Sequence, residues 1–250
     1  MNQRLIVIAR YWNDIEWVEA SLKHIEMWDP QAVVLSEGNW DQQWSPRSTD
    51  GTRNILEDWA SGKDHVQVID NVRADKNYRV NQANTSNLAM TLVDADVGDW
   101  VLVVDCDHFY HEKDIKAVRE LMEKEKDVDY FTMPTLGFLV DLSTCQYTVD
   151  KVGTKIPYRL KPRFNWRPTN HLSIRVDWYC NRHDTKAMHL PWCNAYHYER
   201  MRLPKRHEDK YNIGDRKTPK QAGRESKLEP CRHNDHPALA VPVLKEMGYL

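Results

Sequence analysis

The chain has 250 residues, of which 41% are hydrophobic and 29% are charged, and its formal net charge is −2. This length suits one large α/β domain or two small ones, and the near-neutral charge gives no general attraction to nucleic acid or to an anionic membrane. No apolar run approaches the roughly 18 residues of a membrane span, and the first residues lack the apolar core of a signal peptide, so we expect no transmembrane segment.

The first half of the chain alternates short apolar runs with segments of helical spacing. Runs rich in Val, Ile and Leu predict buried strands at residues 5–9, 32–35, 66–69 and 100–104. Apolar residues at helical spacing predict helices within 15–25, 55–59, 79–93 and 112–122. Asn13 or Asp14 is the expected N-cap of the first helix. This alternation through residue 125 predicts a doubly wound, mostly parallel sheet with helices on both faces.

The second half of the chain changes character. Short, partly antiparallel strands are expected at residues 130–133, 137–140, 144–149 and 174–178, and a short helix containing Val243, Leu244 and Met247 ends the chain. We therefore expect a smaller antiparallel region that completes the same domain. Residues 200–227 carry ten Lys/Arg against four Asp/Glu with few apolar residues, which predicts either a mobile basic loop that meets an anion or a solvated loop without a role.

Two carboxylates stand at the end of the central predicted strand. Asp105 and Asp107 directly follow the apolar run 100–104. Open α/β sheets bind ligands at the carboxyl ends of their strands, and two carboxylates one residue apart suit a hard divalent cation that also holds a diphosphate. Aspartate is also a common turn residue. The pair alone therefore leaves a metal site and a structural turn open.

Three further motifs accompany this pair. Ser48-Thr-Asp-Gly-Thr52 precedes a predicted helix, Gly98-Asp99 opens the central strand, and Asn13-Asp14 follows the first strand. Together with Asp105-Cys-Asp107 they resemble the pattern of glycosyltransferase family two on the GT-A fold, over roughly residues 4–125. The sequence departs from that pattern after the second strand, where Ser36-Glu37-Gly38 is followed by an inserted loop before Ser48.

The resemblance implies a nucleotide-sugar-dependent transferase in two halves of one domain. Residues 1–125 would bind the nucleoside-diphosphate sugar donor, and residues 126–250 would bind the acceptor. Asp105 and Asp107 would hold Mn²⁺ or Mg²⁺ at the donor diphosphate, with His197 as the third ligand unless it is a surface or core histidine. The candidate contacts to the nucleotide are Arg10, Asn13, Glu37, Arg79, Asp105, Arg200 and Lys205.

The acceptor and the catalytic base are open at this stage. A glycan, a lipid-linked glycan or a modified nucleobase would each supply a hydroxyl, and a nucleic acid acceptor would meet the basic segment 200–227. An inverting reaction needs a carboxylate that takes the acceptor's proton, whereas a retaining one does not. The candidates for this base are Asp141, Asp177 and Glu199.

Two rival interpretations come from other features. The last third of the chain is rich in Cys and His, and such soft ligands build structural zinc sites, although none of the spacings is a standard zinc signature. These residues are Cys180, His183, His189, Cys193, His197, Cys231, His233 and His236.

Five cysteines without a Cys-x-x-Cys pair also fit reduced thiols and a cytoplasmic location.

The other rival is a nucleotidyltransferase or a non-catalytic nucleotide-sugar-binding protein on the same type of sheet. A nucleotidyltransferase normally carries a glycine-rich, basic loop after the first strand. Here that place reads Arg10-Tyr-Trp-Asn13, without glycine. The sequence therefore favours the glycosyltransferase interpretation and leaves the binding protein open.

Overall fold

The structure is a computed structural model, and it describes part of the chain in detail. The described residues are 3–138, 142, 144–149, 157–161, 166–168, 176–178, 186–198, 229–230 and 235–250.

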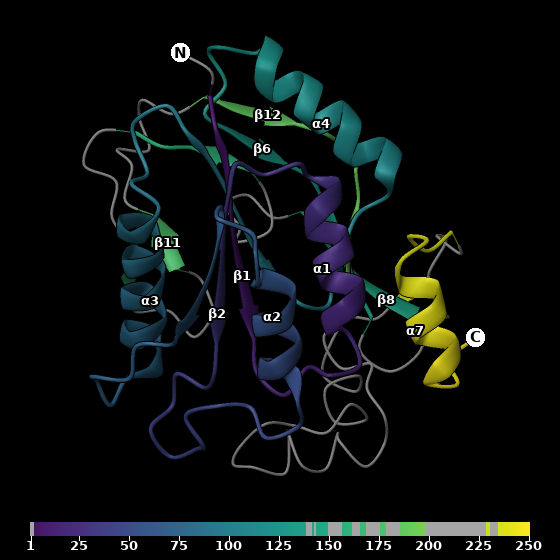
Figure 1. The fold of residues 1–250 in the computed structure, drawn as a ribbon. Coiled ribbons are helices and arrows are strands. Elements are labelled where there is room, and N and C mark those ends of the chain that lie inside the picture. The colour runs from purple at the N-terminus through teal and green to yellow at the C-terminus, as the bar shows by residue number, and fades with distance from the viewer. Residues whose placement is uncertain are drawn as a thin grey trace.

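A seven-stranded sheet forms the centre of the molecule, with the order β12-β6-β9-β4-β1-β2-β3 (Figure 1). Its strands are β1 (Leu5–Tyr11), β2 (Ala32–Glu37), β3 (Val66–Asp70), β4 (Trp100–Asp105), β6 (Tyr130–Thr132), β9 (Tyr158–Arg159) and β12 (Ala187–His189). β1 pairs in parallel with β2 and β4, β2 with β3, and β6 with β12. Within this sheet, as far as the chain is described, only β9 runs antiparallel to its neighbours β4 and β6. The mostly parallel sheet expected from the sequence is confirmed.

Helices cover both faces of this sheet. They are α1 (Val18–Met27), α2 (Thr52–Ala60), α3 (Tyr78–Leu92), α4 (Glu112–Lys124) and α7 (Ala240–Glu246). Alternate residues of β1 point to opposite faces: Leu5 and Val7 join one apolar core with α1, α2, α4 and α7, whereas Ile6 and Ile8 join a second core with α3. Figure 1 shows α3 on the opposite side of the sheet from α1 and α2. The predicted doubly wound arrangement is therefore present.

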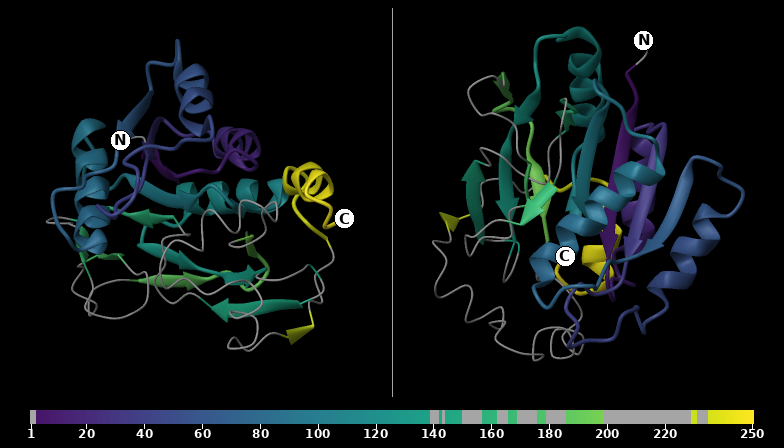
Figure 2. Two further views of the ribbon diagram at one scale, coloured as in Figure 1. Left: turned by 90° about the horizontal axis from the view of Figure 1, so that it is seen from below. Right: turned by 90° about the vertical axis from the view of Figure 1, so that its left-hand side faces the viewer.

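A second sheet of five strands packs beside the first, as Figure 2 shows. Its order is β14 (Glu229–Pro230), β8 (Thr144–Val149), β7 (Pro134–Gly137), β13 (Ala195–His197) and β5 (His108–Phe109). All neighbours are antiparallel except β7 and β13. A separate two-stranded ribbon, β10 (Trp166–Pro168) with β11 (Val176–Trp178), lies against α3. The smaller antiparallel region is thus present, but one of its strands, β5, comes from the first half of the chain.

Two local features differ from the prediction. The first helix begins at Val18 with Trp17 as its N-cap, so neither Asn13 nor Asp14 caps it. Asn13 instead has a positive φ of 51°, and both residues belong to a turn that is held by other contacts. The strand expected to begin at residue 137 begins earlier, because β7 pairs with β8 from Pro134 to Gly137; residues 139 and 140 lie outside the described part of the chain.

No helix among the residues that the structure describes is long and apolar enough to cross a membrane.

His24 gives the fold a predictable response to acid. It is fully buried on α1, where its Nε2 accepts the Tyr110 N–H at 3.1 Å, and burial lowers its pKa to about 3. The unfolded chain binds a proton at His24 below about pH 6.5 and the folded chain does not, so stability is complete above that pH and falls as the pH decreases. We expect His24 alone to remove about 2 kcal/mol of unfolding free energy between about pH 6.5 and pH 5.

Urea unfolding at several pH values measures this effect. The variant His24→Gln should show a flatter dependence of unfolding free energy on pH, and the control His65→Gln, at an exposed position, should keep the wild-type slope. An unchanged slope in His24→Gln would show that other groups cause the loss at low pH.

Candidate functional site

The candidate site lies where β4 ends and the chain crosses from the first sheet to the second. Residues 100–104 of β4 are buried, and the strand reaches the sheet edge with Asp105, beside Arg10 of β1. After a two-residue turn, β5 pairs with β13 so that His108 faces His197. The turn therefore brings residues from both halves of the chain to one place.

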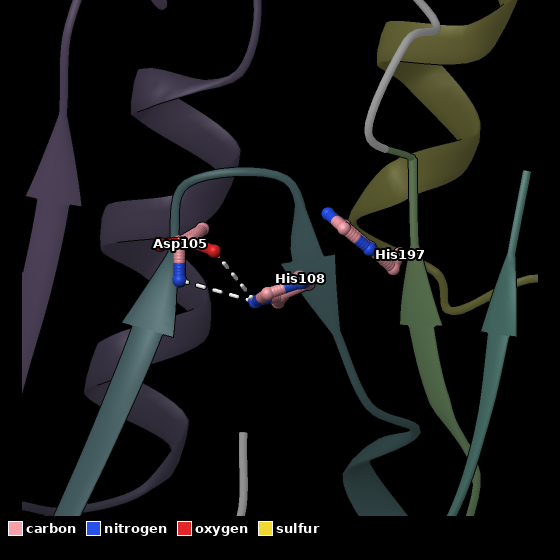
Figure 3. A group of neighbouring side chains, drawn as sticks. All are labelled: Asp105, His108 and His197. Carbon is pink, nitrogen blue, oxygen red and sulfur yellow. Dashed lines mark hydrogen bonds and ion pairs between the residues drawn. The ribbon is translucent and has the colours of Figure 1, made fainter. Parts of the chain in front are cut away.

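Acidic and imidazole side chains meet at this crossing. One possible ligating atom from each of Asp105, His108 and His197 lies within 4.8 Å of the other two (Figure 3). Asp107, which is 5% exposed, places its Oδ1 3.5 Å from the Nε2 atom of His197. The structure thus brings the three residues predicted to hold a metal close together, and it adds His108 to them.

His108 was not singled out from the sequence. Its Nδ1 accepts the backbone N–H of Asp105 at 3.1 Å, and its ring is 1% exposed. Since Nδ1 accepts, the neutral ring carries its proton on Nε2. The ring packs edge-on against that of His197, with centroids 4.0 Å apart. His108 therefore fixes the turn that carries Asp107 and supports the ring of His197.

Arg10, a predicted contact to the nucleotide, lies within β1 rather than after it. It is the sixth residue of β1, 5% exposed, and its Nη2 lies 2.7 Å from Oδ1 of Asp105. The guanidinium therefore neutralises Asp105 within the site. Because one oxygen of Asp105 is held in this way, Asp107 is the carboxylate better placed to hold a cation.

Asn13 and the motif at residues 48–52 are joined to each other by hydrogen bonds at the sheet edge. Asn13 N–H donates to Oγ of Ser48 at 2.9 Å, and Thr49 N–H donates to Oδ1 of Asn13 at 2.9 Å. Asp50 accepts from the backbone of Ile15 and of Thr52, and Asp14 N–H donates to Thr52. These bonds fasten the start of α2 to the turn after β1.

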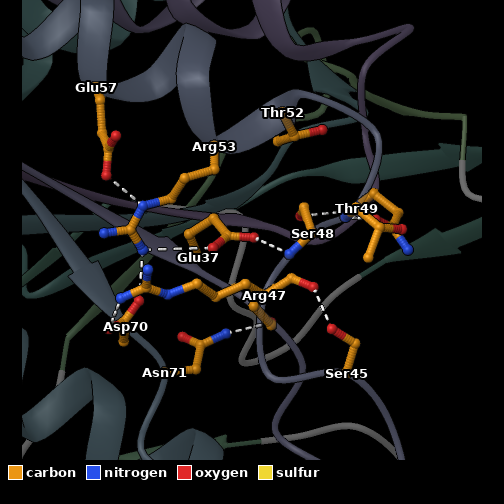
Figure 4. A network of polar contacts seen from close by, with 12 residues as sticks. Glu37, Ser45, Arg47, Ser48, Thr49, Thr52, Arg53, Glu57, Asp70 and Asn71 are labelled. Carbon is orange, nitrogen blue, oxygen red and sulfur yellow. Dashed lines mark hydrogen bonds and ion pairs between the residues drawn. The ribbon is translucent and has the colours of Figure 1, made fainter.

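Glu37 belongs to the polar network in Figure 4. Its side chain has no exposed surface; Oε1 accepts the Ser48 N–H at 2.8 Å and Oε2 lies 3.4 Å from Arg53. Arg53 also pairs with Asp70, a residue that Arg47 holds as well, and these two arginines lower the pKa of Asp70. Glu37 here holds the loop through Ser48 and Arg53, and its predicted contact with the nucleotide stays a prediction. Asp70, with half its side chain exposed, is the acid that faces outward.

The other predicted residues are not brought into this cluster. Arg79 lies near the start of α3, where its guanidinium contacts the neighbouring Tyr78. Asp177 is in β11, in the ribbon against α3. Several predicted residues lie outside the described part of the chain: Asp141, Glu199, Arg200, Lys205 and the basic segment 200–227.

The histidines and cysteine proposed for zinc have separate partners where they are described. His189 Nδ1 bonds to Thr132, Cys193 Sγ lies 3.6 Å from Met133 Sδ, and His236 Nδ1 bonds to Tyr198. Among the residues described, Asp105, His108 and His197 form the one group of three or more such side chains close enough to hold a metal, and Asp107 stands beside it through its contact with His197. Cys180, His183, Cys231 and His233 lie outside them.

The fold and the cluster together define an α/β protein with an acidic site at the carboxyl edge of its sheet. Residues 47–137, just over a third of the chain, match the model of glycosyl transferase family 2. This range contains the 48–52 motif and both aspartates of the cluster, so the resemblance found in the sequence is confirmed over this part. No curated protein gives a significant match.

Two solved structures are similar to parts of the chain. The first is a 4-diphosphocytidyl-2C-methyl-D-erythritol synthase, with 11% identity and a TM-score of 0.41, covering 64% of this chain and 76% of that chain. The second is a mannose-1-phosphate geranyltransferase from Thermus thermophilus, with 12% identity and a TM-score of 0.32, covering 64% of this chain and 56% of that chain.

Proposed function

We propose that the protein is a glycosyltransferase that moves a sugar from a nucleoside-diphosphate sugar to an acceptor hydroxyl, with a divalent ion held at the end of β4. The observation that carries this proposal is that His197 Nε2 lies 3.5 Å from Asp107 Oδ1 at the edge of the sheet. Asp107 belongs to the segment, residues 47–137, that matches glycosyl transferase family 2. The acceptor-binding role of residues 126–250 is part of the same proposal.

The donor set fits a divalent cation. Asp107 offers carboxylate oxygens from a position that is 5% exposed, beside the imidazole of His197. Mg²⁺ and Mn²⁺ both favour oxygen ligands, and Mn²⁺ also accepts an imidazole such as that of His197. When bound, such an ion would stabilise the negative charge that develops on the departing diphosphate.

The residues around the cation site have distinct roles in this proposal. Asp107 and His197 hold the ion, and His108 keeps the turn and the His197 ring in place through its bond to the Asp105 N–H. Arg10 keeps Asp105 paired, so the site carries less negative charge when a diphosphate arrives. Asp141, Asp177 and Glu199 stay candidates for the base, and Arg200 and Lys205 for contacts to the diphosphate.

Incubation with a panel of nucleotide sugars and Mn²⁺ tests the proposal. We expect slow release of nucleoside diphosphate by hydrolysis, because water replaces the absent acceptor, and we expect EDTA to stop it. Release of pyrophosphate from a nucleoside triphosphate and a sugar phosphate would instead identify a nucleotidyltransferase. Binding of nucleotide sugars without any turnover would identify a binding protein, and either result would contradict the proposal.

A further inference from the structure

Arg10 is an arginine whose hydrogen bonds are largely unmade within the described part of the chain. Its side chain is 4% exposed, and within the residues that the structure describes only Nη2 is used, in the pair with Asp105. Among the residues that the structure describes, none accepts a hydrogen bond from Nε or Nη1. A buried N–H without a partner costs free energy, so such groups are usually matched by a water or a ligand.

Trp40 stands over this arginine and has an unused donor of its own. The guanidinium carbon of Arg10 lies 5.9 Å from the centre of the Trp40 ring, within reach of a cation–π contact. The Nε1 atom of Trp40 is buried and meets no acceptor within the described part of the chain. Two neighbouring side chains thus present N–H donors that no described residue accepts.

The loop that carries Trp40 is the insertion that separates this chain from the family pattern, and it is held firmly. Gly38, with φ of +109°, starts it close to Pro46: a Cβ at Gly38 would lie 2.1 Å from the Pro46 carbonyl oxygen. Asn81 donates to the Trp40 carbonyl at 2.9 Å, and Arg73 donates to the carbonyls of Asp41 and Trp44. These contacts therefore hold in place the backbone of the loop that carries the Trp40 ring.

Arg10 and the loop that carries Trp40 lie where an open α/β sheet binds its ligand. β2 and β3 lie on one side of β1 and β4 lies on the other, so the strand order reverses between β1 and β4. Arg10 and Asp105 are register partners across this point. Ligands bind outside the carboxyl ends of the strands at such a reversal. The unused donors of Arg10 and Trp40 are next to it.

We propose that Arg10 and Trp40 select the base of the nucleotide donor by donating hydrogen bonds to carbonyl oxygens, so that the site takes keto bases such as uracil or guanine in preference to amino bases such as adenine. This inference rests on the proposed function, and it assigns a role to an insertion that the family pattern lacks.

The chemistry of the donors favours a neutral carbonyl over a phosphate. Asp105 already balances the positive charge of Arg10, which leaves N–H groups without a net charge to attract an anion. An exocyclic amino group would place its own N–H against these donors, and that arrangement leaves both unsatisfied.

Calorimetry in the presence of Mn²⁺ tests the proposal with two matched pairs of ligands. Inosine diphosphate differs from adenosine diphosphate in a keto for an amino group, and uridine diphosphate differs from cytidine diphosphate in the same way. We expect at least one pair to favour the keto member by about tenfold or more. The variant Trp40→Phe keeps an aromatic wall and removes the N–H, so it should reduce that preference about fivefold. Arg10→Lys should reduce it further.

The possible results separate this inference from the function on which it rests. If no nucleoside diphosphate binds, the proposed function fails. If all four bind equally, or if Trp40→Phe leaves the preference unchanged, the proposed function stands and base selection by these residues is wrong. If pyrophosphate binds as tightly as the nucleotides and Arg10→Lys weakens it equally, Arg10 contacts phosphate and the inference is also wrong. Trp40→Phe keeps the test valid should Arg10→Lys fail to fold.

Discussion

Replacement of Asp107 by asparagine is expected to lower kcat/KM of the metal-dependent reaction about a thousandfold, or about 4 kcal/mol in transition-state stabilisation. The amide is nearly the same size as the carboxylate but carries no charge, so it holds a divalent ion poorly. The fold should survive, because Asp107 lies in the turn between β4 and β5 and contributes little apolar surface to either core.

Three measurements on the Asp107→Asn variant separate loss of the ion from loss of structure. Calorimetric titration with Mn²⁺ should show weakened binding, turnover of the nucleotide sugar should be lost, and the thermal unfolding midpoint without metal should stay close to that of the wild type. Asp58→Asn, at an exposed position of α2, is the matched control and should match the wild type in all three. Full turnover in Asp107→Asn at the wild-type Mn²⁺ concentration would contradict the assignment.

Replacement of His197 by glutamine is expected to weaken the binding of Mn²⁺ more than the binding of Mg²⁺. The imidazole is the one nitrogen ligand that the proposal assigns to the ion, and nitrogen ligands favour Mn²⁺ over Mg²⁺. We expect Mn²⁺ affinity to fall about a hundredfold, and Mg²⁺ affinity to fall clearly less. The preference of the enzyme for Mn²⁺ should therefore shrink in His197→Gln.

Activity titrated against each metal gives this comparison directly. His189→Gln is a suitable control, because His189 lies on β12 and bonds to Thr132, away from the cluster. Equal losses for both metals in His197→Gln, with unchanged unfolding temperature, would mean that His197 is not a ligand and acts through its neighbours.

The central sheet and the position of the acids could be predicted from the sequence because both depend on local pattern. Apolar runs such as residues 100–104 have few alternatives to a buried strand, and the carboxyl end of a parallel strand is a known ligand position. Asp105 and Asp107 follow from these two rules. His197 was reached only through the resemblance, because no local pattern relates it to β4.

The pairing of strands in the second sheet and the partners of the charged residues could not be predicted in this way. β5 is two residues long and is defined by pairing with β13, far along the chain. His108 therefore looks like a loop residue in the sequence although it is buried. Arg10 was expected to follow the first strand and contact the nucleotide, and nothing local indicates that β4 supplies Asp105 to pair with it in the interior.

The crossing from β4 into β5 ties two parts of the chain that lie about ninety residues apart, since Asp107 comes from one and His197 from the other. An ion that binds both residues would bind the folded chain, in which they are 3.5 Å apart, much more tightly than the unfolded chain, in which about ninety residues separate them. Under the proposed function, metal uptake should therefore favour the assembled state of both sheets together, so that the concentration of free ion would also influence how long the protein survives proteolysis.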